Sequence, residues 1–377
     1  MSKTRSAIWL VAACCATAHV SGAPNPDLVI HEWGTITTVH AADGTPQGHL
    51  NKIDEAEVLP EFVHQYEPET TRNDPKKVLI KAPRVPGRPD VTLRLETPVI
   101  YFHPGSRQHY ETPIDVTVLF RGGVQNEFYP LGEADVYLDE ARIADKTTAG
   151  LIPKTWTGEV LNNFVLGSLK WQGVKLHDTV VAPLTNDPVW LAPREVQAAS
   201  VFLPEAGEGE RYLFYRGVAA LPALLQTRHK SGAVTLSAPT NLVWLTSETV
   251  QLPNVWLVEV RADQTITFRE HGAITLKKSA LGKEVARLGR FANADFAPGN
   301  LAALRASLKA ALIKDGLFAD EAEAMLNTWK HSYFEKPGRR VFYVVPRGWT
   351  DYFLPLQFSV PARVNRVLIG RIDLLGR

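Results

Sequence analysis

The sequence predicts a mainly β protein, an antiparallel β-sandwich followed by a C-terminal mixed α/β segment that contains a helical hairpin. Three observations support this fold class. Apolar and polar residues alternate with period two in several stretches between residues 91 and 275. Near residue 280 the apolar period becomes that of a helix. The 26 prolines, 26 glycines and 9 tryptophans of the 377 residues are typical of a loop-rich β protein with large aromatic core residues.

These patterns divide the chain into four segments. Residues 1–23 have basic, apolar and small residues in the order typical of an export signal. Residues 24–90 form an irregular N-terminal segment with short strands expected at 28–30 and 36–39. The sandwich domain is expected over 91–275. The last segment, 276–377, contains the helical hairpin and the C-terminal strands. These strands can pair with the main sheet, so residue 276 is not a strict domain boundary.

The clearest strands have one apolar face. Residues 114–120 alternate up to Gly122-Gly123, and residues 256–260 and 266–268 flank a turn, which predicts a β-hairpin. Tyr212–Tyr215 and Leu242–Leu245 are further strand candidates. Antiparallel pairing of many short strands is typical of a sandwich.

Two amphipathic helices are expected next. One buries a face that ends before Gly316, and the second begins near Asp320, with Glu323 completing a capping-box-like start. Together they span about 299–331 as a hairpin packed on the sheet. Residues 341–345 and 367–372 have the apolar pattern of buried strands.

The N-terminus indicates export. Lys3 and Arg5 precede an apolar stretch, and Ser21-Gly22-Ala23 suits cleavage, so we expect a periplasmic or secreted protein beginning near Pro24. The alternative is an outer-membrane lipoprotein processed at Cys14. Cys14 and Cys15 are the only cysteines, so no disulfide is expected.

The charge of the mature chain limits its partners. Residues 1–23 hold two basic residues and no acid, so their removal takes the formal net charge from +1 to −1. A nearly neutral chain has no general attraction to nucleic acid or to an anionic membrane. The mature chain also has no segment expected to lie in a membrane.

The chemically most suggestive motif is His31-Glu32 beside Trp33. A histidine next to a carboxylate can serve as a general base or bind a metal. Neighbours on a strand point to opposite faces, unless a turn at Gly34 brings the two side chains together. A structural role, with Glu32 capping or pairing and Trp33 in a core, is the commoner arrangement for such residues.

Other chemistries have weaker support. The histidines form no metal-binding motif, and those between residues 31 and 64 are more typical of solvated loops than of a Ca²⁺ or Zn²⁺ site. The sequence has no nucleophile elbow and no glycine-rich phosphate loop. We therefore expect no metal and no cofactor.

Arginines and aromatic residues supply the candidate binding surface. An arginine can bind a carboxylate in a bidentate manner, and a flat aromatic ring can stack on a sugar. Pairing of Arg347 with Asp351, four positions later, and aromatic core packing are the structural alternatives. The candidate binding residues are Trp33, Tyr101, Tyr129, Tyr215, Arg216, Arg340 and Arg347.

Four stretches resemble a largely uncharacterised family of exported bacterial β-rich proteins. They are HEWGT at 31–35, ETPVIYF at 96–102, YLFYRG at 212–217, and PRGWTD at 346–351 followed by LPL at 354–356. The chain departs from the pattern at Phe128 and Tyr333, where the family prefers Trp. The second and third stretches are also similar to strands of another group of bacterial β-sandwich proteins. The resemblance implies an exported β-rich protein and no particular activity.

Two functions follow from these residues. The first is an exported envelope or extracellular module that binds a polysaccharide, another envelope component or a protein. The alternative is a metal-independent hydrolase or lyase acting on an anionic polysaccharide. In this enzyme His31 or a tyrosine would act as base, Glu32 or Asp351 as acid, and Arg347 would neutralise the substrate carboxylate. Either function predicts that His31 or Glu32 lies close to the Arg340, Arg347 and Asp351 region, because the N-terminal strand should dock beside the C-terminal strands.

Overall fold

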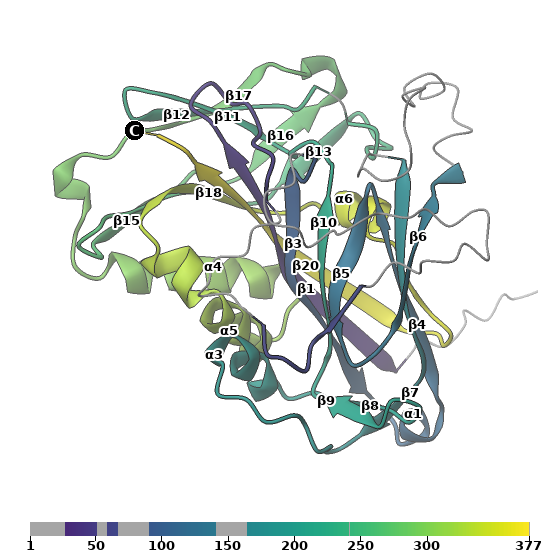
Figure 1. Cartoon of the computed structure of the whole chain (residues 1–377). Coiled ribbons are helices and arrows are strands. Elements are labelled where there is room, and N and C mark those ends of the chain that lie inside the picture. Colours follow the sequence, from purple (N-terminus) through teal and green to yellow (C-terminus); the bar gives the residue numbers. More distant parts are fainter. Residues whose placement is uncertain (1–26, 51–58, 67–89, 141–163, 241, 377) are drawn as a thin grey trace, which may run out of the picture.

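The computed structural model describes residues 27–50, 59–66, 90–140, 164–240 and 242–376 (Figure 1). The predicted export signal, including Cys14 and Cys15, lies outside these residues. Within them, no helix is long and apolar enough to span a membrane. The fold is mainly β, with antiparallel sheets and with most of its helices in the C-terminal region, as the sequence predicts.

The described strands form one large sheet of nine strands through the middle of the molecule. Central strands β1 and β20 run parallel to each other, and the other neighbours are antiparallel. In spatial order the strands are β15 (Ile266–Glu270), β14 (Val255–Val260), β18 (Gly338–Val344), β20 (Arg363–Leu374), β1 (Leu28–His40), β3 (Leu93–Pro104), β10 (Leu213–Ala219), β5 (Gly123–Tyr129) and β2 (His64–Gln65).

Three other sheets occur within the described ranges. The second sheet contains β19 (Leu356–Phe358), β4 (Ile114–Arg121), β7 (Val165–His177), β8 (Ser200–Leu203) and β9 (Glu208–Glu210), with β6 (Glu133–Leu138) also paired to β7. The small sheet contains β11 (Gln226–Lys230), β12 (Ala233–Ser237) and β17 (Glu284–Gly289). A two-stranded ribbon pairs β13 (Thr249–Leu252) with β16 (Ile274–Lys277).

The large sheet has an apolar core on each face. On one face it shares a core with the other sheets, and β4 shows the predicted alternation because Ile114, Val116, Val118 and Phe120 are all buried there. The opposite face packs on helices, with Trp256 and Val258 of β14 against Leu304 and Leu308. The predicted β14–β15 hairpin is confirmed.

The predicted helical hairpin is confirmed as α4 (Asn300–Lys314) and α5 (Ala319–Thr328), which lie beside the large sheet in Figure 1. Helix α5 begins two residues earlier than the predicted Asp320–Glu323 pair requires, because Phe318 is the N-cap and Glu321 bonds back to its amide. The other helical segments among the described residues are α1 (Gln108–Glu111), α3 (Pro188–Leu191), η2 (Ala192–Glu195), η3 (Lys278–Ala280), η4 (Asn293–Asp295), the π-helix η5 (His331–Glu335) and α6 (Arg347–Phe353).

The predicted segments are not separate in space. Strands from 24–90, 91–275 and 276–377 all belong to the large sheet, since β1, β3 and β20 lie side by side. Residues 28–40 form one long strand rather than two short ones. Leu242–Leu245 is not a strand: its ends are joined by a turn hydrogen bond, and Leu242, Trp244 and Leu245 are buried as loop residues.

Candidate functional site

Strand β1 places His31 and Glu32 on opposite faces of the large sheet. The backbone stays extended through Gly34, so the turn that would have brought the two side chains together does not form. A Cβ on Gly34 would lie 3.0 Å from the Cα of Pro98, so glycine here permits the close approach of β3. Pro98 cannot donate a ladder hydrogen bond, and the register of the β1–β3 pair shifts at this point. His31 therefore faces the helices and Glu32 the core of the sandwich.

Glu32 is held in a fully buried ion pair. Its Oε2 atom accepts from Nε of Arg366, 2.6 Å away, and its Oε1 atom accepts from the Tyr215 hydroxyl, also at 2.6 Å. Arg366 also donates to Asp351 at 3.2 Å and to the carbonyl oxygen of Leu354. Burial and the neighbouring Glu32 charge raise the pKa of Tyr215 well above its ordinary value, so this phenol stays neutral.

The predicted proximity of the two ends of the chain is confirmed. Glu32 is connected to Asp351 through Arg366, a residue that no pattern in the sequence indicates. Arg347 lies one step farther out, where its Nε atom donates to both oxygens of Asp351 at 2.7 Å. Its side chain is 45% exposed and that of Asp351 48%, and the two residues are four apart in helix α6. Both candidate acids, Glu32 and Asp351, therefore form salt bridges with arginines.

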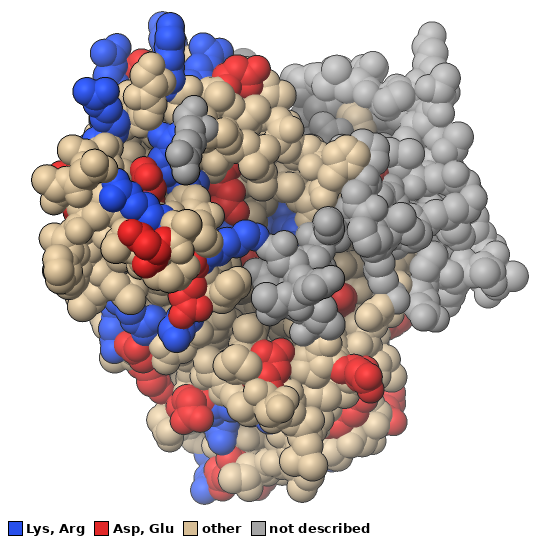
Figure 2. Space-filling model, turned by 60° about the vertical axis from the view of Figure 1, so that its left-hand side comes forward, with Lys and Arg blue, Asp and Glu red and all other residues tan. Residues whose placement is uncertain are grey.

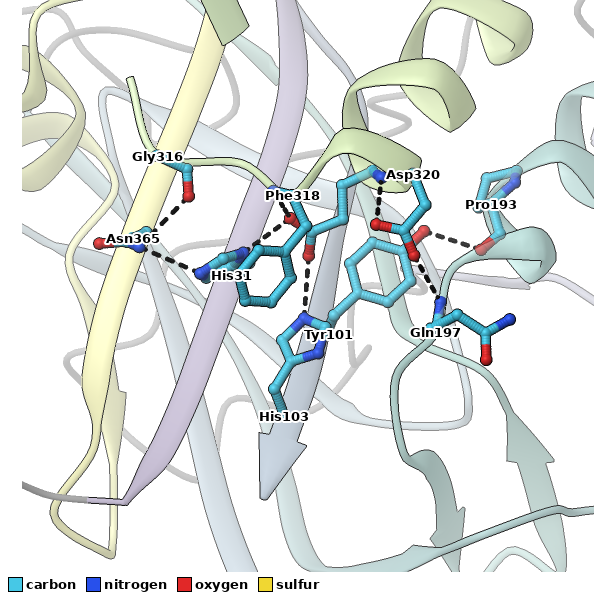
Figure 3. A network of polar contacts seen from close by, with 10 residues as sticks. His31, Tyr101, His103, Pro193, Gln197, Gly316, Phe318, Asp320 and Asn365 are labelled. Atoms are coloured by element: carbon cyan, nitrogen blue, oxygen red, sulfur yellow. Dashed lines mark hydrogen bonds and ion pairs between the residues drawn. The ribbon is translucent and has the colours of Figure 1, made fainter. Parts of the chain in front are cut away.

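On the helix face, His31 joins His103 and Glu321 in one cluster (Figure 3). Nδ1 of His31 lies 2.7 Å from Oε2 of Glu321, and Nε2 of His103 lies 2.9 Å from Oε1 of the same carboxylate. Asn365 donates its amide N–H to Nε2 of His31 at 3.0 Å. The three residues come from β1, β3 and α5, and we name them the His–His–Glu cluster.

Glu321 is the centre of this cluster. It lies in the first turn of α5, where its Oε2 atom also accepts the Phe318 amide at 2.7 Å. Burial favours the neutral acid, but hydrogen bonds from His103 and His31 outweigh it and hold the pKa of Glu321 at about 2. The carboxylate is thus ionised, although its side chain is fully buried.

Surrounding contacts fix the position of the cluster. Asp320 accepts the backbone N–H of Gln197 at 2.8 Å, and the hydroxyl of Tyr101 donates to the carbonyl of Pro193 at 2.9 Å (Figure 3). The Phe318 ring lies against both imidazoles, with centroid distances of 4.6 Å to His31 and 4.8 Å to His103. The first turn of α5 is therefore held against β1 and β3 from several sides.

The predicted aromatic–arginine surface does not form from the residues that the sequence suggested. Trp33, Tyr101, Tyr129 and Tyr215 are buried, because large aromatic side chains of central strands fill the two cores. Arg216 is buried beside Glu127, 3.8 Å away. Arg340 is buried and donates to the carbonyls of Ser332, Tyr333 and Lys336, and its loss of hydration lowers its pKa to about 10. Of the seven candidates, Arg347 alone is exposed.

A different set of arginines surrounds an open groove of about 1360 Å³. The groove lies at the ends of β14 and β20 and at the start of β18. The turn between β11 and β12 and the segment after β17 also line it. Its walls carry the basic residues Arg261, Arg290 and Arg339 and the acidic residues Glu259, Asp263 and Asp295. We call this the arginine groove. The sequence gives no local sign of it, because its residues come from five separate places in the chain.

The arginines of the groove differ in how they are held. Arg261 donates to Asn293 at 2.7 Å and lies 3.3 Å from the centroid of the Phe296 ring. Arg339 donates to the carbonyls of Gly232 and Gly376. Arg290 is exposed, and within the described residues its side chain has neither a hydrogen bond nor an ion pair. It therefore has its donors available for a ligand.

Comparison with known proteins gives no assignment, since no protein-family model and no curated protein matches this chain.

Proposed function

We propose that the protein is an exported binding module that holds an acidic polysaccharide in the arginine groove. The observation that carries this proposal is the exposed Arg290 guanidinium, which has no partner among the described residues and lies beside two positioned arginines in an open groove. Arginine is suited to carboxylates because its planar fork can form two parallel hydrogen bonds. The pattern of residues 1–23 supports export to the periplasm or medium.

The acidic residues of the groove favour a sugar polymer over a simple polyanion. Asp263 accepts from the amide and hydroxyl of Thr265, and Asp295 accepts the Ala292 amide, which leaves further acceptor capacity on each carboxylate. Donors and acceptors side by side match a ligand with both carboxylate and hydroxyl groups. A uronic-acid polysaccharide has this combination.

The small sheet extends the basic surface beyond the groove. Arg228 and Lys230 are exposed on β11. Arg228 is in register with Thr235 of β12, which pairs with Arg287 of β17, an exposed arginine that forms an ion pair with Glu284. Figure 2 shows Lys and Arg gathered toward the upper left of this view. A polymer that leaves the groove along the small sheet would meet further cations, which supports an extended ligand rather than a monosaccharide.

Catalysis by the residues that the sequence suggested has less support. A hydrolase or lyase needs a base and an acid on the same side of its substrate. His31 and Glu32 lie on opposite faces of the large sheet, and Asp351 is bonded to Arg347 and Arg366. Individually paired groups of this kind suit a binding module.

We expect the protein to bind a polyuronate more tightly than a neutral glucan of equal length, with affinity that falls as salt is added. Isothermal titration calorimetry at two ionic strengths measures this. Replacement of Arg290 with alanine should weaken binding about tenfold or more, since a hydrogen bond to a charged group contributes about 1.5–3 kcal/mol.

Arg107 provides a matched control for Arg290. It is an exposed arginine paired with Asp178, away from the groove, so Arg107→Ala should leave the affinity unchanged. Equal binding of the neutral glucan, or equal losses in the two variants, would contradict the proposal. Release of shortened polymer by the wild-type protein would show that the hydrolase or lyase alternative is correct.

A further inference from the structure

We infer that the His–His–Glu cluster is a binding site for a transition-metal ion, Zn²⁺ in the first instance. The donors are Nδ1 of His31, Nε2 of His103 and the carboxylate of Glu321. All of these atoms lie within 4.8 Å of one another. This inference is independent of the arginine groove, with which the cluster shares no residue.

The chemistry of the donors selects the class of metal. Two imidazoles and one carboxylate suit zinc and its neighbours, whereas Ca²⁺ and Mg²⁺ prefer sites made of oxygen atoms. Tetrahedral zinc with bonds of about 2.0–2.2 Å holds its ligand atoms roughly 3.3 Å apart. The nitrogen–oxygen separations of 2.7 and 2.9 Å therefore need to open by about 0.5 Å.

The surroundings of the cluster suit a metal centre. The site is buried, with side-chain exposures of 1% for His31, 13% for His103 and 0% for Glu321. Glu321 supplies a carboxylate to the cluster, and the Phe318 ring lies against both imidazoles. Three protein ligands leave a fourth position for water, and His103 is the most solvent-accessible of the three side chains.

Metal binding requires the protons on the ligating imidazole nitrogens to move. Asn365 donates to Nε2 of His31, so that nitrogen accepts, and Nδ1 carries the proton that bonds to Glu321. His103 must shift the Nε2 proton that it donates to Glu321 to its own Nδ1 before Nε2 can bind a metal. A metal on Nδ1 of His31 likewise requires the proton of that ring to move to Nε2. With Nε2 protonated, Asn365 must turn its amide oxygen toward His31 and give up its 3.3 Å bond to Gly316.

Asn365 therefore acts as a positioning residue that controls the affinity of the site. In Asn365→Asp a carboxylate accepts the Nε2 proton without this rotation, and it also makes His31 a stronger ligand. We expect this variant to bind zinc more tightly than wild type. A cluster that serves only as a hydrogen-bonded support would show no zinc affinity for the substitution to change.

The test uses the full mature chain, freed of metal with a chelator and titrated with Zn²⁺ in a calorimeter. We expect one zinc per chain and a higher melting temperature, and Ca²⁺ should produce neither effect. His103→Gln and Glu321→Gln should abolish this stoichiometric binding. His64→Gln is the control, because His64 is also bonded to a glutamate, Glu208, at 2.8 Å and lies outside the cluster.

A second measurement requires no variant and remains decisive if the substitutions prevent folding. Anomalous diffraction at the zinc edge from crystals grown with Zn²⁺ should give a peak about 2.1 Å from the three donor atoms. The inference is overturned if wild type binds no zinc, if His103→Gln binds as wild type does, or if the peak lies elsewhere.

Discussion

Replacement of Arg366 with methionine is expected to lower the free energy of unfolding by about 3–5 kcal/mol. The substitution keeps most of the side-chain volume but removes the cation. Glu32 would then be a fully buried carboxylate whose remaining side-chain partner among the described residues is the Tyr215 hydroxyl. A buried charge that has lost its counter-ion is costly because it is also cut off from water. Chemical denaturation monitored by tryptophan fluorescence measures the loss.

Two further variants show whether the buried pair causes this loss. Arg347→Ala removes an exposed arginine from the same network, and we expect a loss of at most about 1 kcal/mol because solvent screens that salt bridge. Adding Glu32→Gln to Arg366→Met should recover part of the stability, since the unpaired charge is removed. A smaller loss for Arg366→Met than for Arg347→Ala would show that the buried pair does not hold the two ends of the chain together.

Stability is also expected to fall by about 3 kcal/mol between pH 6.5 and pH 4 because of His40. This histidine is fully buried at the end of β1, and burial lowers its pKa from 6.5 to about 4. Its Nδ1 atom accepts from Thr227, and within the described residues its Nε2 atom has no hydrogen-bond partner. Protonation therefore gains no compensating contact.

The sign of the effect follows from the two pKa values. The unfolded chain takes up a proton near pH 6.5, while the folded protein resists protonation until about pH 4. The contribution is thus complete above pH 6.5, is lost as the pH falls from 6.5 to 4, and does not change further below that. Unfolding free energies measured at several pH values give the curve.

Two histidine-to-asparagine variants separate the contribution of His40 from that of other titrating groups. His40→Asn keeps an acceptor near Thr227 but cannot titrate. Between pH 6.5 and pH 4 its unfolding free energy should therefore fall by about 3 kcal/mol less than that of wild type. His271→Asn, at an exposed position, should leave the curve unchanged. A wild-type curve that is flat from pH 7 to 4, or an equal slope in His40→Asn, would contradict the role of His40.

The fold was largely predictable where local pattern decides it. Strand β4 and the β14–β15 hairpin have one buried face each, and helix α4 has a continuous apolar face. Strand β1 was predicted as two short pieces because Gly34 and the polar residues around it resemble a break. Its polar side chains are buried because β20 and β3 flank it and both faces are covered, and such pairing depends on distant parts of the chain.

The candidate site was predictable only in part for the same reason. Glu32 and Asp351 were selected and are connected, but the connecting Arg366 lies in a stretch of β20 where polar residues suggest a solvent-exposed strand end. Glu321 resembles an ordinary acidic residue in the first turn of a helix, and it lies 290 positions from His31. Side chains that meet over such separations leave no spacing signal in the sequence.

The most direct measurement of the central claim is amide hydrogen exchange of the protein with and without a saturating polyuronate. Binding in the arginine groove predicts slower exchange at the walls of the groove, in residues 231–232, 259–263, 290–295 and 337–339. Exchange around the predicted catalytic residues His31, Glu32 and Asp351 should not change. Protection confined to those three residues, or no protection anywhere, would contradict the assignment of the groove as the binding surface.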